Sequence, residues 1–140
     1  MQTKKMNPEV KALWLADLRS GQHQQAEAVL CRAVEDENDT DAPVVKGWCC
    51  LGRLEDIKVK LDGKAWSFDA YEERMVSPFR NEADIEAGDT ILTEAVREWA
   101  GLDSLNPSFI DAEGSSHTLS GMNDCGSTFE QLADVIEKYF

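Results

Sequence analysis

The segment GWCCLGRLEDI, residues 47–57, combines two adjacent cysteines, a glycine and a regular series of apolar residues. Four of these recur at the spacing that places side chains on one side of a helix, namely Cys50, Leu51, Leu54 and Ile57. Gly52 has no side chain, so another backbone can approach such a helix closely at this point. Because buried free thiols behave as small hydrophobic groups, we expect a short helix whose apolar side, cysteines included, packs into a core.

The following segment, IKVKLDGKAWSF (residues 57–68), alternates apolar and polar residues on both sides of Asp62-Gly63. An Asp-Gly pair is frequent in two-residue type I′ turns, and such a turn would pair Val59 with Trp66 across two strands. The sequence therefore predicts a β-hairpin over residues 57–68, with its apolar face turned toward the core.

Helices are predicted on both sides of this region. Asn7 can accept hydrogen bonds from the first amides of a helix, and Pro8 has no amide to leave unpaired. Ser127 and Glu130 have the S-x-x-E spacing of a capping box. The expected helices run from Asn7 to Gly21, from Asp89 or Thr90 to Gly101, and from Ser127 to residue 140.

Three other segments are less regular. Residues 26–34 fit a helical face and also a short buried strand, and their pattern leaves both open. The segment EDENDTDAP (residues 35–43) has five acids in its first seven residues and is typical of a solvated loop. Residues 103–126 are rich in turn formers and predict a long loop, which inside a small domain is often functional.

The chain has 140 residues, of which 42% are hydrophobic, and a domain of that size buries roughly two thirds of its unfolded surface. We predict a single α+β domain over residues 1–140, with three to four helices on a small antiparallel sheet that contains the 57–68 hairpin. There is no apolar run of 18 residues and no signal-peptide pattern, so we expect a cytoplasmic protein without membrane contact.

Charge gives the main indication of function. The formal net charge is -13, and residues 81–140 contribute -11 of it, from thirteen acids and two bases. Such a charge repels phosphate backbones, so direct nucleic-acid binding is not expected, whereas a basic protein surface is a natural partner. The candidate partner-binding residues are Glu82, Asp84, Glu86, Asp89, Glu94 and Glu98.

Chemical sites are weakly indicated. The sequence contains no phosphate-binding glycine loop, no H-E-x-x-H and no nucleophile elbow, so we favour a protein that is not an enzyme and predict no cofactor. Cys49, Cys125 and His117 lack the paired spacing of metal ligands, and no metal is predicted. The alternative is a pocket formed by the 103–126 loop and the cysteine segment, with candidate residues Cys49, Cys50, Asn123 and Asp124.

Four sequence blocks resemble a widespread group of small proteins from tailed phages and prophages. The blocks are WLADLRSG (14–21) with Gln25, WCCLGRLEDI (48–57), VREWAGL (96–102) with Asn106-Pro107, and LSGMNDCGSTFEQLADVIEKYF (119–140). The sequence departs from the pattern of this group at His23, Trp48, Arg53 and Glu55. The resemblance favours an extended strand for residues 26–34.

The resemblance implies an accessory protein made in an infected bacterial cell, and it carries over no site residues. Together with the charge, it leads us to expect a non-enzymatic binder or inhibitor of a host protein with a basic surface, such as a nucleic-acid-binding or defence protein. The alternatives are the small-molecule or enzyme site described above, and a virion assembly or structural component whose acidity serves solubility. The sequence indicates no oligomeric state.

Overall fold

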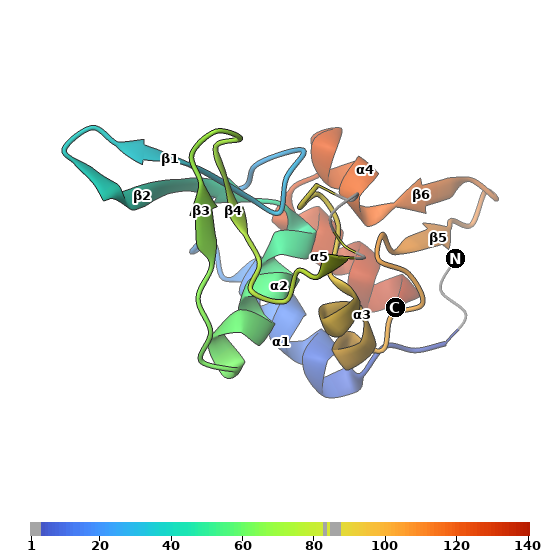
Figure 1. Ribbon diagram of the computed structural model, residues 1–140. Helices are drawn as coiled ribbons and strands as arrows, with labels where there is room; N and C mark the ends of the chain where they lie inside the picture. The colour runs from blue at the N-terminus through green and yellow to red at the C-terminus, as the bar shows by residue number, and fades with distance from the viewer. Residues whose placement is uncertain (1–3, 83, 85–87) are drawn as a thin grey trace.

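The computed structural model describes the backbone of residues 4–82, 84 and 88–140, and the side chains of these residues except 39–41. The helices are α1 (Pro8–Arg19), α2 (Cys50–Leu61), α3 (Glu94–Ala100), α4 (Leu119–Asp124) and α5 (Phe129–Tyr139). The strands are β1 (Cys31–Asp36), β2 (Asp39–Trp48), β3 (Ser67–Asp69), β4 (Arg74–Val76), β5 (Ser108–Ile110) and β6 (Ser116–Thr118). The prediction of one α+β domain is confirmed (Figure 1).

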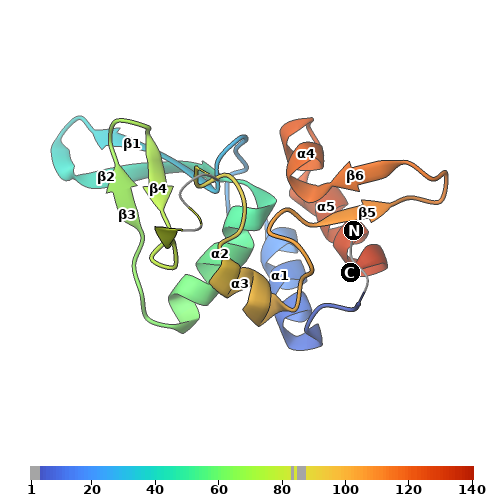
Figure 2. The same ribbon diagram turned by 45° about the vertical axis from the view of Figure 1, so that its right-hand side comes forward.

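The larger sheet is antiparallel and has the strand order β2-β1-β4-β3. The long β1–β2 hairpin pairs Cys31 with Trp48 at its base and Val34 with Val44 further out. One residue pair, Arg32 with Arg74, joins β1 to β4, so the two hairpins of this sheet are paired along a short length. The β1–β2 hairpin extends away from the helices, and the separate β5–β6 hairpin projects at the other end of the molecule (Figures 1 and 2).

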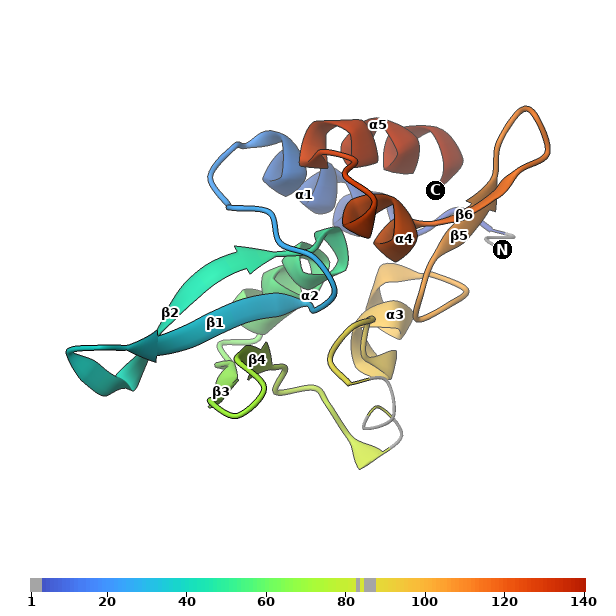
Figure 3. The ribbon, with the colours of Figure 1, turned by 90° about the horizontal axis from the view of Figure 1, so that it is seen from above.

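The helices enclose the main core. α1 lies against α5 and α2, and α3 and α4 close the remaining sides of α2 (Figure 3). Trp14 of α1 is fully buried, and its indole Nε1 donates to the carbonyl of Cys50 over 2.9 Å. The predicted start of α1 is confirmed, because the Asn7 side chain accepts from the amides of Glu9 and Val10.

α2 is the central element, and its N-terminal half confirms the helix predicted for the cysteine segment. Gly52 is required there, because a Cβ at this position would lie 1.8 Å from the carbonyl oxygen of Leu30. The Leu30 carbonyl accepts from the amide of Cys49, so the chain that leads into β1 is held directly against the start of α2.

The predicted hairpin at 57–68 is wrong. Residues 57–61 are the last turns of α2, and Asp62 is the C-cap, whose amide donates to the carbonyl of Lys58. An Asp-Gly pair with a positive φ at glycine ends a helix as well as it forms a hairpin turn, and Gly63 has φ +64°. A helix that is already formed extends at low cost, so the short alternation of apolar residues did not decide the local structure.

Two predicted loops contain regular structure. Residues 35–43 are mostly part of the β1–β2 hairpin, and residues 103–126 contain β5, β6 and α4. Water solvates charged side chains on an exposed hairpin as well as it does in a loop, so the acids of the first segment are compatible with either structure. Residues 26–34 contain the start of β1, in agreement with the extended conformation that the resemblance favoured.

Two predicted helix starts are displaced. The N-cap of α3 is Thr93 rather than Asp89 or Thr90, because Asp89 is buried between arginines and has φ +59°. The capping box of α5 is formed by Thr128 and Gln131 rather than by Ser127 and Glu130. Ser127 with Glu130 and Thr128 with Gln131 both have the spacing of a capping box. The amide of Phe129 donates to the Gln25 side chain, and this contact fixes Phe129 as the first residue of α5.

Candidate functional site

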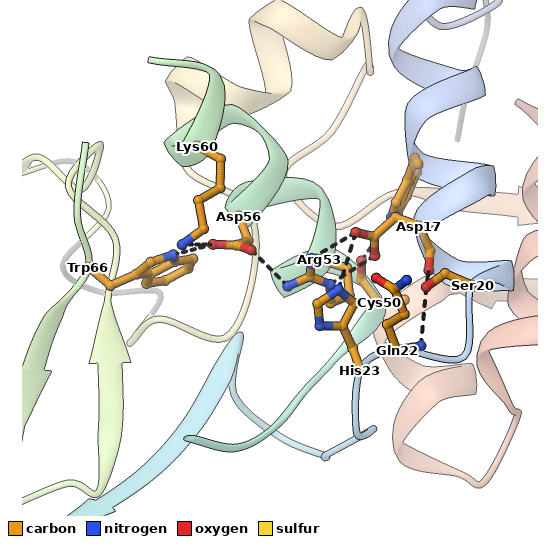
Figure 4. Close-up of polar contacts among 10 residues, drawn as sticks. Asp17, Ser20, Gln22, His23, Cys50, Arg53, Asp56, Lys60 and Trp66 are labelled. Carbon is orange, nitrogen blue, oxygen red and sulfur yellow. Dashed lines mark hydrogen bonds and ion pairs between the residues drawn. The ribbon is translucent and has the colours of Figure 1, made fainter. Parts of the chain in front are cut away.

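A buried charged network joins α1, α2 and the sheet (Figure 4). The guanidinium of Arg53 donates to Asp17 on α1 through Nε (2.8 Å) and Nη2 (2.7 Å), and to Asp56 through Nη1 (2.9 Å). The Arg53 side chain is only 4% exposed. Burial lowers the pKa of this guanidinium, but the hydrogen bonds and charges of Asp17 and Asp56 outweigh burial and raise it. Arg53 is therefore permanently charged and fully compensated.

The same network holds the base of both hairpins of the larger sheet. Arg53 lies 4.7 Å from the centre of the Trp48 ring at the end of β2, a cation–π contact. Asp56 accepts from the indole Nε1 of Trp66, which precedes β3, over 2.9 Å. The two tryptophans pack edge to face, 5.4 Å apart. The projecting hairpins are thus fastened to α2 by polar contacts, because the apolar cluster under the sheet is small.

Glu55 is another buried acid on α2, next to Asp56, and it is fully buried with no cationic partner among its contacts. It accepts from the hydroxyl of Ser77 (2.5 Å) and from the amide of Thr93 (3.0 Å), so it joins α2 to the end of β4 and the start of α3. Burial raises the pKa of this carboxyl, against the lowering effect of the hydrogen bonds. Arg53 and Glu55, two of the four departures from the phage-protein pattern, therefore both have structural partners.

The predicted pocket around the cysteines is closed. Cys49, Cys50 and Asn123 are buried, whereas Asp124 is exposed. A hollow of about 220 Å³ lies beside them, and its lining includes Asn123 and Gln25 but neither cysteine. The Asn123 side chain accepts from Gln25 Nε2 (2.8 Å) and the Cys50 amide (3.2 Å), and donates to the carbonyl of Ala26. Asn123 therefore connects three segments of the fold.

Three of the four thiols are buried and one is exposed. Burial raises the pKa of Cys31 and Cys49 to about 12 and raises that of Cys50 well above its ordinary value. Cys125 is exposed. Cys49 acts as a helix cap, since its sulfur accepts from the amide of Gly52 at 3.3 Å. Among the residues described, no three His, Cys, Asp or Glu side chains form a group that could hold a metal ion.

The six acids predicted to bind a partner do not lie together on the surface. Asp84 and Asp89 are 5% exposed: Asp84 accepts from the amide of Asn81, and Asp89 pairs with Arg74 and Arg80. Three members are exposed, and Glu86 lies outside the described residues. The exposed members are Glu82, Glu94 and Glu98, of which Glu94 pairs with Arg97.

The structure brings two further acids, Glu35 and Glu37, to an exposed position near the end of the β1–β2 hairpin. Residues 35–41 contain five acids and no base, and their backbone forms the end of the β1–β2 hairpin. The β3–β4 turn flanks β1, because the amide of Ala33 donates to the carbonyl of Glu73. We define the hairpin surface as seven of the exposed residues of these two hairpins, which are Glu35, Glu37, Val44, Val45, Tyr71, Glu72 and Glu73; Lys46 is exposed on the same β1–β2 hairpin.

The hairpin surface is also partly apolar. Tyr71 is 93% exposed, and Val44 and Val45 are 38% and 44% exposed. Sequence reasoning missed this surface because it treated the acids of residues 35–43 as a loop and residues 57–68 as the hairpin. The available signal was the series of apolar residues on either side of the acids, which is typical of two paired strands.

Comparisons with known proteins identify a family. No curated protein and no solved structure matches the chain. In the part of the chain that the structure describes, no helix has the length and apolar character needed to cross a membrane. The model of one family matches residues 6–140. The chain therefore belongs to the family described as "Domain of unknown function (DUF8296)".

Proposed function

We propose that this protein is a non-enzymatic binder that occupies a basic surface of another protein through its hairpin surface. The observation that carries the proposal is the position of two exposed acids, Glu35 and Glu37, near the end of a hairpin that projects from the helical body (Figure 3). The sequence of residues 35–41 contains five acids and no base. A projecting acidic segment attracts a basic surface and accelerates association with it.

Apolar groups beside these acids support the same proposal. Charge alone gives speed and specificity of association, whereas affinity depends on a few well-buried apolar or aromatic residues. Tyr71 is almost fully exposed on the β3–β4 turn, and tyrosine is enriched in the residues that dominate binding energy. Tyr71 is the residue that we expect to be buried by the partner.

The remaining features limit how the partner binds. Pro43 and Lys46 lie on β2, one of the two edge strands of the larger sheet. A proline without an amide and an exposed lysine both discourage the addition of another strand to an edge. Binding is therefore proposed to use the side chains of the hairpins rather than extension of the sheet. From the sequence resemblance, we place this interaction in a bacterial cell that carries the phage or prophage.

A capture experiment with two matched variants tests the proposal. Tagged protein is incubated with bacterial lysate, eluted with a salt gradient, and the eluted proteins are identified by mass spectrometry. The test variant carries Glu35→Gln, Glu37→Gln and Glu72→Gln, and the control carries Glu82→Gln, Glu94→Gln and Glu98→Gln, so both lose three exposed charges. We expect a discrete basic partner that elutes as salt rises and that the test variant alone fails to retain.

The two variants also separate the two acidic surfaces. If only the control variant lost the partner, the binding surface would be the one expected from the acids of residues 81–140. If both variants retained it equally, binding through exposed acids would be refuted.

A further inference from the structure

The β5–β6 hairpin projects at the opposite end of the molecule from the hairpin surface (Figure 2). A second surface feature lies between this hairpin and α5. It is a hollow of about 360 Å³ whose lining combines aromatic, aliphatic and acidic side chains. An adjoining hollow of about 300 Å³ shares His117 and Met122 with it and continues toward α4. We refer to the first of these as the C-terminal hollow.

The floor of the C-terminal hollow is a stack of three rings. Phe109 on β5 lies nearly parallel to Tyr139 on α5, with ring centres 4.4 Å apart, and nearly parallel to His117 on β6, at 5.2 Å. Phe109 is 5% exposed, so the outer two rings present the accessible surface. Met122 and Val135 form the aliphatic wall. Flat groups pack well on such a floor, because aromatic faces are apolar and electron-rich.

Hydrogen bonds hold the acidic side of the hollow in place. Asp111 Oδ2 lies 2.7 Å from His117 Nε2, while Asp111 Oδ1 accepts from the amides of Glu113 and Ser115, each at 2.9 Å. These contacts, the histidine first, lower the pKa of Asp111, so the carboxylate is charged at neutral pH. Asp134 on α5 lines the other side. Its carboxylate contacts Arg19 at 2.9 Å and is 68% exposed.

The chemistry of the lining selects one kind of occupant. Lys138 also lines the hollow, and its Nζ lies 5.2 Å from the Tyr139 ring, so a cation of the chain itself already contacts this ring. An anion would meet two carboxylates beside this lysine, and the chain as a whole carries a net charge of -13. A guanidinium group is planar, so it can stack on a ring while one of its N–H groups donates to a carboxylate, whereas an ammonium group cannot stack in this way.

We propose that the C-terminal hollow binds an arginine side chain of another protein, with the guanidinium stacked on the exposed rings and paired with Asp111. This site is separate from the hairpin surface and does not depend on the function proposed for it. An arginine bound here would give the protein a second contact point, and two linked contacts bind more tightly than either alone.

The test uses small peptides, so that no partner has to be known. The ¹⁵N-labelled protein is titrated in low salt with acetyl-Gly-Arg-Gly-amide, and amide shifts are followed by NMR. The matched control peptide has citrulline in place of arginine, which keeps the shape and removes the charge. A third peptide has lysine at that position. We expect saturable millimolar binding of the arginine peptide, with shifts in β5, β6 and α5, and at least fivefold weaker binding of the other two.

Variants check the location of binding. Asp111→Asn should weaken the arginine peptide at least fivefold, and its spectrum should otherwise show a folded protein. The variant with Glu35→Gln, Glu37→Gln and Glu72→Gln should bind the peptide as the native protein does. Equal binding of the arginine and citrulline peptides, or shifts confined to the β1–β2 hairpin, would overturn the proposal. Equal binding of the lysine peptide would overturn the stacking of the guanidinium.

Discussion

The substitution Arg53→Met should destabilise the fold strongly, because it removes the shared partner of two carboxylates. The side chains of Asp17 and Asp56 are only 14% and 6% exposed. Removal of one partner from a buried ion pair typically costs about 3–5 kcal/mol, since the remaining charge loses its compensation. Lys60 lies 3.6 Å from Asp56 and retains part of the compensation, so we expect about 3–4 kcal/mol. For a domain of this size that corresponds to a fall in Tm of roughly 10–15 °C.

The matched control is Arg19→Met, which removes an arginine that also contacts several acids. Arg19 pairs with Glu130, Asp134 and Glu137, whose side chains are 59–68% exposed, so water replaces the lost contacts. Exposed ion pairs contribute little to stability, because water screens them. Urea denaturation, followed by tryptophan fluorescence and circular dichroism, gives both values. If the two variants differed by less than about 1 kcal/mol, the structural role assigned to the buried network would be refuted.

Three further predictions concern α2 and the thiols. Gly52→Ala should lower the free energy of unfolding by about 3 kcal/mol or more, because the added Cβ meets the Leu30 backbone. Gly63→Ala, at a position with a positive φ but open space, should lower it by about 1 kcal/mol. Equal losses in denaturation experiments would contradict the close contact at Gly52. With a thiol reagent at neutral pH, Cys125 should react quickly and the three buried thiols only on unfolding; fast reaction of a second thiol would show that the cysteine segment is open. Because the pKa of Glu55 is raised, its contribution to stability is complete below its ordinary value of 4.5 and is lost as pH rises through the folded pKa. Glu55→Gln should therefore gain stability relative to the native protein as pH rises above 4.5, and a constant difference in the free energy of unfolding would show that Glu55 does not titrate in the folded protein.

The sequence was most informative where a local pattern had a single physical solution. Asn7 and Pro8 start a helix in any context, and the apolar spacing of the cysteine segment fits a buried helix. The sequence also indicated that Gly52 allows another backbone to approach closely, but it did not indicate that this backbone is that of Leu30. Local signals of this kind do not depend on which distant segment packs against them.

The errors occurred where one pattern fits two structures. Asp62-Gly63 serves as a hairpin turn or as a helix end, and only the continuation of α2 distinguishes the two. Contacts between distant segments could not be predicted either. No local pattern indicates that Arg53 donates to Asp17, 36 residues away in the sequence, or that Gln25 donates to Asn123, 98 residues away. For the same reason, the sequence did not reveal that Asp84 and Asp89 are buried and cannot form part of a binding surface.

The proposed hairpin surface is tested most directly by a photo-crosslinking amino acid placed at Tyr71, with a second one at Leu61 as a control. Both positions are exposed, at 93% and 62%, but Leu61 lies at the end of α2 and outside the hairpin surface. After irradiation in bacterial lysate, we predict one discrete crosslinked product from position 71, absent from position 61 and lost when Glu35, Glu37 and Glu72 are changed to glutamine. A product that forms equally at both positions, or that persists in the glutamine variant, would contradict the account.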